Sequence, residues 1–324
     1  MRAALCFDAG PELGFGHAHR GLALGAALQA AGAKVDVLTR TPHALAGLHP
    51  AFPVTVLPDD GAPAVIQAAR GVDVLVFDRL DPAEPLITAV RTGLEGAQLA
   101  LIGNREPEGV SDLVIRQSVN SGPPRPGVLD GPEHLLLKAN FRNLPARQPS
   151  ETVRRALVCL GGGRARGLTR LLAVLDEAAP PSLSHVHVIA EDAQSALPAA
   201  PRRRFLVQRR VDDMARLMAA VDLAIISGGG IVYEAAACGL PALYRPVVDH
   251  QVPLAAAAQR AGLGRLANET PKLDENVFAE RLTALLADAE TRAAMAHTGQ
   301  TLVDGRGAQR VAEALLALRR KAQD

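Results

Sequence analysis

The segment MAAVDLAIISGGGIVYEAAACGLPALYRPVVDHQVPLAAAAQRAGLG, residues 218–264, contains the pattern that decides the fold. An apolar run, Leu223–Ile226, stops at Ser227 and three consecutive glycines, and a helical pattern follows over Ile231–Cys238. A second apolar run, Ala242–Tyr244, comes next and leads into another helical pattern. Continuous apolar runs between helices are typical of strands that are buried on both faces of a parallel sheet. The segment therefore predicts a β-α-β-α unit.

The same alternation extends over most of the 324 residues. Further strands are expected at Ala3–Phe7, Val35–Thr39, Val54–Leu57, Val72–Phe77, Leu99–Ile102, Ala156–Leu160 and Val186–Ala190. Further helices are expected at Ala18–Ala31, Ala64–Arg70, Pro85–Leu94, Ala165–Ala178, Asp212–Ala220, Gln251–Ala261, Asn276–Ala287, Ala289–Leu302 and Ala308–Lys321. Repeated β-α alternation predicts an α/β fold with doubly wound parallel sheets.

A polar stretch with two prolines, residues 145–151, interrupts the pattern and is interpreted as a linker. The predicted organisation is two Rossmann-like domains, 1–146 and 152–306, and a final helical segment, 307–324, that packs back on the first domain. Open α/β sheets bind ligands at the carboxyl ends of their strands. The cleft between two such facing domains is therefore the expected ligand site.

Composition excludes several classes of partner. The net charge is +1 and aromatic residues make up 3% of the chain, which argues against nucleic acid or anionic lipid as a partner. No apolar run reaches the roughly 20 residues that span a bilayer, and the N-terminus lacks a signal-peptide pattern. The cysteines lie in apolar runs and are expected to be buried reduced thiols, which suits the cytoplasm. A basic cluster at 202–210 is expected to be a solvated loop.

The glycine loop Gly228–Gly230 is the most specific candidate site. Glycines before a helix let backbone amides approach a diphosphate at the helix N-terminus. Ile231 and Val232 begin the expected helix, and Glu234 lies one turn further, where its carboxylate can accept hydrogen bonds from both hydroxyls of a ribose. A plain glycine turn in a β-α unit is the alternative interpretation, and the length of the composite pattern disfavours it.

Three weaker candidates accompany this loop. Gly161 and Gly162 belong to LGGGRARG, which is either a second ligand loop or a packing turn. Val211 and Met214 are expected to begin a helix beside the first loop, where they either flank a base or pack in the core. His250 and Gln251 open another helix, from which they can reach a phosphate or a sugar.

The stretch GFGHAHR begins the first expected helix and carries Gly14, Gly16, His17 and Arg20. Taken alone, it is either a ligand loop with a reactive histidine or a tight turn with a structural one. The glycine spacing is not the dinucleotide fingerprint, so a nicotinamide enzyme is disfavoured. No Walker A, Cys-x-x-Cys or His-Glu-x-x-His pattern occurs, so neither a metal site nor P-loop hydrolysis is predicted.

Together these motifs resemble the GT-B superfamily, and within it the UDP-sugar hydrolase of pseudaminic acid biosynthesis and its spore-coat polysaccharide relatives. The resemblance covers nearly the whole chain. It includes the Gly-x-Gly-His-x-x-Arg opening and the segments GPEHLLLKANF (131–141), LGGGRARGLT (160–169), CGLPAL (238–243) and VDGRGAQRVAEAL (303–315). The glycine loop with Glu234 is shared by many GT-B enzymes, including the lipid-linked GlcNAc transferase of peptidoglycan synthesis.

The resemblance implies a UDP-sugar as substrate, with no metal and no further cofactor. The nucleotide would be held by the second half, and His17 would be the base or polar group near the anomeric carbon. Residues on the sugar or phosphate side would be Asp8, Gly14, Gly16, Arg20, His250 and Gln251.

Some positions depart from the hydrolase pattern. Cys6 stands where that pattern has an arginine, Gly103-Asn104 replaces a pair of aspartates, and Ile231 replaces a hydroxyl residue. His250-Gln251, within DHQ, is closer to glycosyltransferases. The leading hypothesis is a UDP-sugar hydrolase-type enzyme of surface glycan biosynthesis. A glycosyltransferase with a hydroxyl acceptor is the first alternative, and a non-catalytic nucleotide-sugar binding protein is the second.

Overall fold

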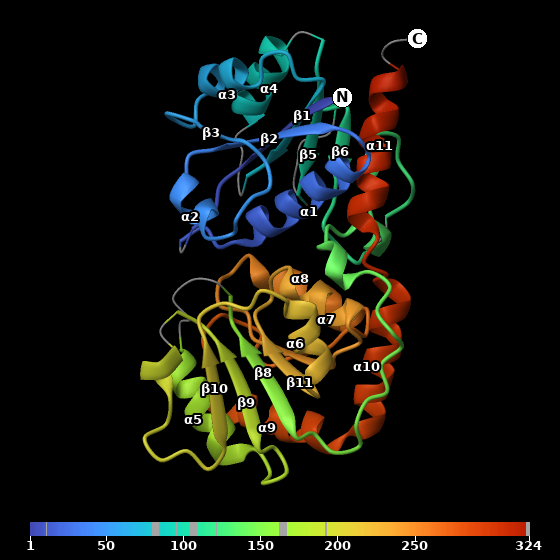
Figure 1. The fold of residues 1–324 in the computed structure, drawn as a ribbon. Coiled ribbons are helices and arrows are strands. Elements are labelled where there is room, and N and C mark those ends of the chain that lie inside the picture. Colours follow the sequence, from blue (N-terminus) through green and yellow to red (C-terminus); the bar gives the residue numbers. More distant parts are fainter. Residues whose placement is uncertain are drawn as a thin grey trace. The chain divides into compact units, whose positions relative to one another are not determined.

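The computed structural model describes residues 1–10, 12–79, 84–94, 96–103, 109–120, 122–161, 167–191 and 193–321. The chain divides into two compact units, each built around one sheet (Figure 1). Unit 1 contains Met1–Ala139 and Gly305–Asp324, and unit 2 contains Asn140–Asp304. Every strand pairing described within the two sheets is parallel. The predicted pair of Rossmann-like α/β domains is thus confirmed.

Unit 1 has a sheet in the order β3-β2-β1-β4-β5-β6-β7. Its strands are β1 (Arg2–Phe7), β2 (Lys34–Thr39), β3 (Val54–Val56), β4 (Val74–Asp78), β5 (Gln98–Ile102), β6 (Leu113–Ile115) and β7 (Val128–Leu129). Its helices are α1 (Gly16–Ala30), α2 (Pro42–Ala46), α3 (Ala62–Ala68), α4 (Glu84–Gly93), α11 (Gly307–Lys321) and the short 3-10 helix η1 (Pro132–His134).

Unit 2 has a sheet in the order β10-β9-β8-β11-β12-β13. Its strands are β8 (Arg155–Cys159), β9 (His185–Ile189), β10 (Arg204–Gln208), β11 (Leu223–Ile226), β12 (Ala242–Tyr244) and β13 (Arg265–Leu266). Its helices are α5 (Leu168–Ala178), α6 (Met214–Ala220), α7 (Ile231–Ala237), α8 (Gln251–Arg260), α9 (Glu275–Ala287), α10 (Ala289–Leu302) and the 3-10 helix η3 (Ala193–Ala196). The 3-10 helix η2 (Ala139–Phe141) starts at the last residue of the first segment of unit 1.

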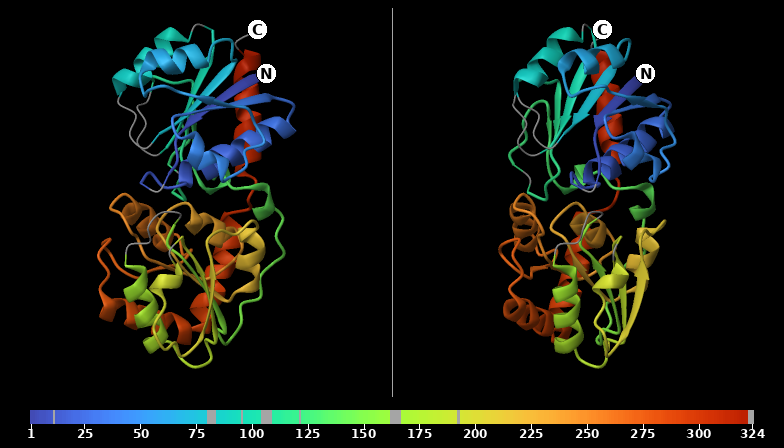
Figure 2. Two further views of the ribbon diagram at one scale, coloured as in Figure 1. Left: turned by 60° about the vertical axis from the view of Figure 1, so that its left-hand side comes forward. Right: turned by 90° about the vertical axis from the view of Figure 1, so that its left-hand side faces the viewer.

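Successive residues of the apolar strands face opposite layers of helices, as a sheet buried on both faces requires. In β1, Leu5 packs with α1 and α11, whereas Ala4 and Cys6 pack with α3 and α4. The layer of α11 includes Val311 and Leu315, both fully buried. Figures 1 and 2 show α11, in red, beside the strands of unit 1 in every view. Residues from both ends of the described chain therefore build one core.

Several short elements differ from the prediction. The sequence predicts neither α2 nor the strands β6, β7, β10 and β13. The region 202–210 is not simply a solvated loop, because Arg204 begins β10 and Arg203 is buried, with Nε 2.8 Å from Oδ1 of Asp176. Helix α6 begins at Met214, so Val211 lies before it and does not begin the helix.

The stretch 145–151, predicted as a linker, lies within unit 2 in the structure. Arg147 anchors it, because the guanidinium donates to the carbonyls of Met218 and Val221, near the end of α6. The backbone amide of Arg147 donates to Oε1 of Gln300 on α10 at 2.8 Å. The polar residues of the stretch 145–151 thus donate hydrogen bonds to carbonyl groups within unit 2, and they also contact solvent.

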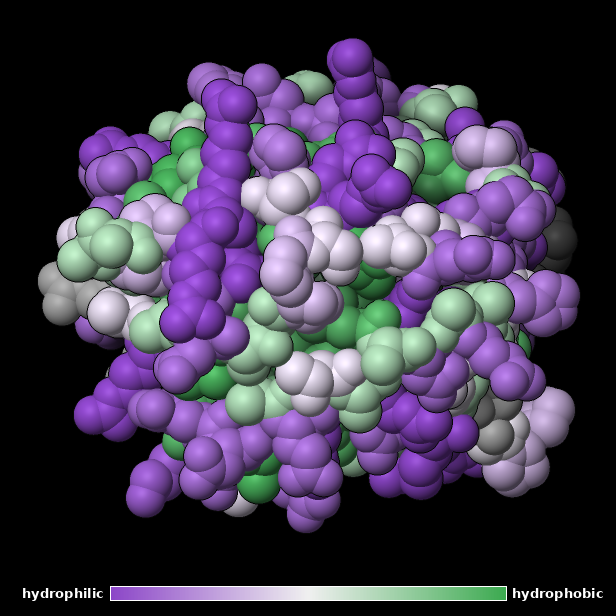
Figure 3. All heavy atoms as spheres, turned by 90° about the horizontal axis from the view of Figure 1, so that it is seen from below, coloured by the Kyte–Doolittle hydropathy of each residue, from purple (hydrophilic) through white to green (hydrophobic). Residues whose placement is uncertain are grey.

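Hydrophilic residues cover most of the face seen in Figure 3, and smaller hydrophobic areas lie between them. Among the described residues, the large hydrophobic side chains that are exposed are Leu13 and Val56. Within the same residues, no helix combines the length and the apolar character needed to cross a bilayer. Most large apolar side chains of the described residues thus lie in the cores of the two units.

Gly307, the first residue of α11, leads to a prediction about stability. A Cβ at this position would lie 2.2 Å from the carbonyl oxygen of Leu135, a backbone atom that cannot turn aside. Gly307→Ala is therefore expected to lower the free energy of unfolding by about 1–3 kcal/mol or more. Thermal unfolding followed by circular dichroism measures this. Gly16→Ala is the control, since a Cβ at Gly16 meets no atom within 4 Å; equal losses in both variants would contradict the argument.

Candidate functional site

The carboxyl ends of β1 and β4 form the edge of unit 1 at which a ligand is expected. These strands pair with each other at the point where the strand order reverses, which is where open α/β sheets bind ligands. Asp8 follows β1, and Asp78 is the last residue of β4. The same reversal in unit 2 lies between β8 and β11, whose ends carry Gly161 and Ser227.

The loop after β1 is held by glycines. Gly10 and Gly14 form an isolated antiparallel bridge, with amide-to-carbonyl distances of 3.1 and 2.7 Å. Gly14 has φ +79°, a conformation that side-chain-bearing residues rarely adopt. Helix α1 then begins at Gly16, with no side-chain cap and no acidic residue in its first turn. The first turn carries His17 and Arg20 instead, so it presents basic groups at the strand end.

His17, Arg20 and Asp78 form a compact cluster at this edge. Nδ1 of His17 lies 2.7 Å from Oδ1 of Asp78, and Nε of Arg20 donates to Oδ2 at 2.6 Å. Nη2 of Arg20 donates to Oδ1 of the same carboxylate. The side chain of Asp78 is 2% exposed and that of His17 is 11% exposed. Burial by itself raises the pKa of Asp78, but Arg20 and then His17 outweigh it and hold that pKa below its usual value.

This geometry fixes which nitrogen of His17 carries a proton. A carboxylate only accepts hydrogen bonds, so Nδ1 of His17 donates to Asp78, and in the neutral ring the lone pair is then on Nε2. Nη2 of Arg20 also lies 3.0 Å from Nδ1, but both groups are donors and share Asp78 as their acceptor. The cluster therefore orients an imidazole with Nε2 available to take a proton.

Sequence reasoning identified His17 and Arg20 but missed Asp78. The available signal was that Asp78 is the first charged residue after the buried run of β4. Its partner His17 is 61 positions away in the sequence, so the contact depends on the pairing of β1 with β4.

Asp8, predicted on the sugar or phosphate side, binds residues at the end of β2. Its carboxylate accepts from the amide and Nε of Arg40, both at 2.8 Å, and from Oγ1 of Thr39 at 3.2 Å. Burial alone would raise the pKa of Asp8, but these contacts with Arg40 lower it overall. The contacts join the ends of two strands, and a contact of Asp8 with sugar stays a prediction.

His19, one turn into α1, gives a prediction about pH. Its Nδ1 is buried and lacks a hydrogen-bond partner among the described residues. Burial, assisted by Lys138, lowers the pKa of His19 from 6.5 to about 4. The unfolded state therefore binds a proton more readily than the folded state, and stability falls as the pH drops from 6.5 towards 4.

In wild type this effect is expected to cost about 3 kcal/mol by pH 4. His19→Gln cannot take up that proton, so its unfolding free energy should fall less over the same range. Urea unfolding of both proteins between pH 7 and 4.5 measures the difference. Parallel stability curves would show that His19 is not buried in its neutral form.

In unit 2, the loop Gly228–Gly230 lies between β11 and α7. A Cβ on Gly228 would lie 2.7 Å from the carbonyl oxygen of Gln251, so α8 packs directly on this glycine. A Cβ on Gly230 would meet nothing within 4 Å, and one on Gly229 would lie 3.6 Å from Nε2 of Gln251. Gly228 therefore serves packing, Gly229 lies at ordinary contact distance from Gln251, and Gly230 faces open space.

The residues after this loop separate into different environments. Ile231 and Glu234 are partly exposed on α7, whereas Val232 is fully buried. The amide of Val232 donates to the carbonyl of Gly229 at 3.1 Å. The side chain of Val232 therefore belongs to the core, and its contact with a nucleotide stays a prediction.

The remaining predicted residues of unit 2 are placed as follows. Gly161 has φ +108°, and a Cβ there would lie 3.9 Å from Oγ of Ser227, so the ends of β8 and β11 meet. Gly162 lies outside the described residues, while Val211 and Met214 are both partly exposed. His250 is exposed at the start of α8. Oε1 of Gln251 accepts from the amide of Val247 at 2.9 Å, which fixes its side chain beside Gly229.

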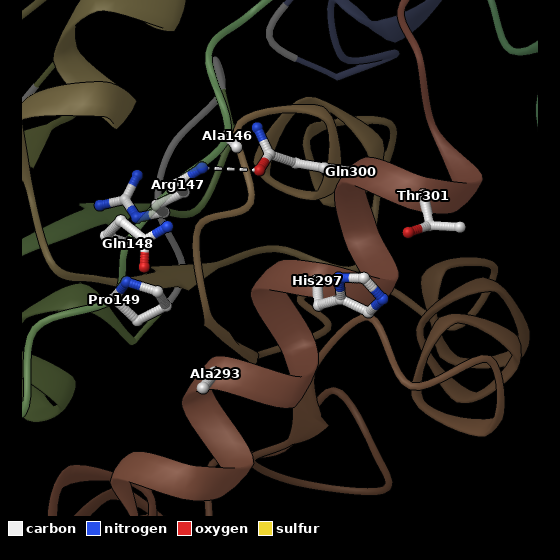
Figure 4. Close-up of a pocket in the computed structure, with 8 residues that line it drawn as sticks. All are labelled: Ala146, Arg147, Gln148, Pro149, Ala293, His297, Gln300 and Thr301. Atoms are coloured by element: carbon white, nitrogen blue, oxygen red, sulfur yellow. Dashed lines mark hydrogen bonds between the residues drawn. The ribbon is translucent and has the colours of Figure 1, made fainter.

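A separate hollow lies between residues 146–149 and α10 (Figure 4). Its volume is about 430 Å³, and His297, Gln300 and Thr301 line it from the helix. Arg147 lies at its other wall and bonds to Gln300. The guanidinium of Arg147 donates to backbone carbonyls, so we attribute this hollow to the anchoring of residues 145–151.

No family model matches the chain. The spore coat polysaccharide biosynthesis protein SpsG of Bacillus subtilis (strain 168) is 26% identical over 266 residues, 75% of this chain and 76% of that protein. The UDP-N-acetylglucosamine–N-acetylmuramyl-(pentapeptide) pyrophosphoryl-undecaprenol N-acetylglucosamine transferase of Cutibacterium acnes is 37% identical over 106 residues, 32% of this chain and 28% of that enzyme.

Solved structures share the fold over almost the whole chain. MurG of Acinetobacter baumannii has a TM-score of 0.72 at 18% identity, covering 98% of this chain and 100% of MurG. The spinosyn rhamnosyltransferase SpnG, complexed with thymidine diphosphate, has a TM-score of 0.67 at 17% identity and covers 100% of both chains. The expected fold is confirmed: the chain has the two-domain GT-B fold of these structures, and it is similar over 75% of its length to SpsG.

Proposed function

We propose that this protein is a glycosyltransferase that moves a sugar from a nucleoside diphosphate donor to a hydroxyl acceptor. The observation that carries the proposal is the oriented pair of His17 and Asp78, 2.7 Å apart at the carboxyl ends of β1 and β4. Imidazole is the side chain best suited to exchange protons near neutral pH. The proposed donor is a UDP-sugar, whose nucleotide would bind at Gly228–Gly230 and Glu234.

In the proposed reaction, Nε2 of His17 takes the proton of the acceptor hydroxyl as its oxygen attacks C1 of the sugar. The bond between C1 and the diphosphate oxygen breaks, and the nucleoside diphosphate leaves with its electron pair. Asp78 is a positioning residue, since its carboxylate holds the imidazole and stabilises the imidazolium that forms. Backbone amides at the glycine loop would balance the charge of the leaving diphosphate, so no divalent cation is proposed.

The sequence alone favours a hydrolase, in which water replaces the acceptor hydroxyl. The named enzymes among the relatives and structural neighbours favour transfer instead, because they include an N-acetylglucosamine transferase and a rhamnosyltransferase. His17 would act as the base in either reaction. The two reactions therefore differ in the acceptor, which is either water or a hydroxyl group.

The test is to incubate the protein with UDP-sugars and dTDP-sugars, with and without alcohol acceptors, and to measure the released nucleotide. Release that requires an acceptor supports the transferase. Release in water alone, at an unchanged rate, would identify a hydrolase. UDP binding without release from any donor would leave a binding protein, and chelator-sensitive turnover would contradict the metal-free proposal.

A further inference from the structure

Arg245, directly after β12, is a buried arginine that the proposed mechanism does not use. It is 3% exposed, and its backbone amide donates to the carbonyl of Ile226 at the end of β11. This places Arg245 at the same edge of the sheet as the glycine loop. The sequence marks it only as the residue that follows the apolar run Ala242–Tyr244.

The guanidinium of Arg245 is poorly satisfied. Nη1 donates to the carbonyl of Pro246, whereas Nε is buried and has no hydrogen-bond partner within the described residues. Burial lowers the pKa of Arg245, and no carboxylate in the described chain forms an ion pair with it. An uncompensated buried charge is costly, so it calls for an anion that binds there.

Other buried arginines of unit 2 have their donors occupied. Arg203 pairs with Asp176 at 2.8 Å. Arg292 donates to four carbonyl oxygens, of residues 150, 151, 285 and 286, at 2.6–3.1 Å. The buried arginines that stabilise the fold of unit 2 therefore have hydrogen-bond acceptors for their guanidinium groups. Arg245 differs from them, because its Nε has no such acceptor among the described residues.

The side chain of Arg245 is directed to the start of α5. A Cβ on Gly167, the residue before α5, would lie 3.3 Å from Nη2 of Arg245. Gly167 has φ +78°, so a glycine is required there and no side chain covers the guanidinium from that position. Helix α5 has 11 residues, with no side-chain cap and no acidic residue in its first turn. Its N-terminal amides carry partial positive charge, which attracts anions.

We propose that Arg245 and the first turn of α5 together bind a phosphate of the nucleoside diphosphate donor. This inference rests on the proposed function and deepens it, because it adds a charged group to the glycine loop that the sequence identified. Arginine matches phosphate geometry with two parallel donors, and the free Nε is suited to such a contact. The same contact would favour release of the sugar by stabilising the diphosphate as its charge develops.

The experiment measures binding of uridine, UMP, UDP and inorganic pyrophosphate by calorimetry to wild type, Arg245→Met and Arg245→Lys. Arg245→Met is expected to weaken UDP binding about tenfold to a hundredfold, since hydrogen bonds to charged groups are the strong ones. Uridine, which has no phosphate, should bind both proteins equally. Arg245→Lys should fall between the two, because it keeps the charge and loses the paired donors.

The matched control is Arg292→Met, which removes an equally buried arginine of the same unit. It should lower the melting temperature of the unliganded protein and leave the ratio of UDP to uridine affinity unchanged. Arg245→Met should melt no lower than wild type without ligand, because it removes an uncompensated charge. A lower melting temperature with unchanged UDP affinity would assign Arg245 to the fold and overturn the proposal.

The outcomes separate this inference from the proposed function. If wild type binds neither UDP nor uridine, the proposed function fails whatever Arg245 does. If wild type binds UDP and Arg245→Met binds it equally well, only the role of Arg245 fails. Pyrophosphate binding as tight as that of UDP would assign the site to a free anion and overturn the assignment to the donor.

Discussion

Replacing His17 by alanine is expected to lower kcat for sugar transfer by about 10²–10⁴-fold, the usual contribution of a positioned general base. The affinity for UDP should stay within about twofold of wild type, because the proposed nucleotide contacts come from unit 2 and a change of 0.4 kcal/mol or less is expected there. Steady-state turnover and calorimetry on the same preparation measure the two effects. An exposed histidine of unit 1, His43, provides the control substitution, and His43→Ala should retain full turnover.

Asp78→Asn tests whether the proposed base, His17, depends on the carboxylate that positions it. An asparagine keeps the shape of the side chain but presents an amide that can turn either its oxygen or its NH₂ group to His17. The imidazole then loses its fixed orientation and the negative charge that supports its protonated form. We expect kcat to fall and the acid limb of the pH profile of turnover to shift to lower pH, because the protonated imidazole loses its carboxylate partner, whereas His17→Ala has no such limb to shift. Unchanged kcat in His17→Ala would remove the base from the proposed mechanism.

Glu234→Ala is expected to weaken UDP binding about tenfold or more, since its carboxylate is proposed to accept hydrogen bonds from the ribose hydroxyls and such charged bonds contribute about 1.5–3 kcal/mol each. The sharpest measurement compares UDP with 2′-deoxy-UDP. Wild type should prefer the ribose form, and Glu234→Ala should lose most of that preference. Glu269→Ala, which removes a carboxylate that is 78% exposed in the same unit, is the control.

The two substitutions together test the division of roles between the units. His17→Ala should act on turnover and Glu234→Ala on affinity, so their effects should be additive if the residues act independently. If both reduce UDP affinity by the same factor, the assignment of nucleotide to unit 2 is wrong.

Much of the fold follows from the sequence because its longer strands are continuous apolar runs between helices. The strand β1 and the segment from β11 to α8 are examples, and both are found where expected. Strands of two or three residues, such as β13 and β7, contain too few positions to show any periodicity. The strand β10 was not predicted because it starts at Arg204 in a basic cluster, and the burial of the preceding Arg203 against Asp176 is a tertiary contact.

The site was predicted only in part, because some of its residues belong to local sequence patterns and others do not. His17, Gly14 and the glycine loop belong to local patterns, which a sequence displays directly. Asp78 and Arg245 do not, since their importance arises from partners that strand pairing brings close. The burial of Val232 likewise depends on which side of α7 meets the core. Local sequence patterns show neither the contacts between residues that are far apart in the sequence nor the burial of a side chain.

The place of α11 in unit 1 also sets an order of assembly during synthesis. Residues 1–139 leave the ribosome long before 305–321, yet Leu24 and Leu28 of α1 share one apolar layer with Val311 and Leu315. Unit 2 is complete as soon as residue 304 has emerged, whereas the first unit to be translated must wait for the last helix. Nascent chains that stop before residue 305 should therefore expose that apolar layer and depend on chaperones.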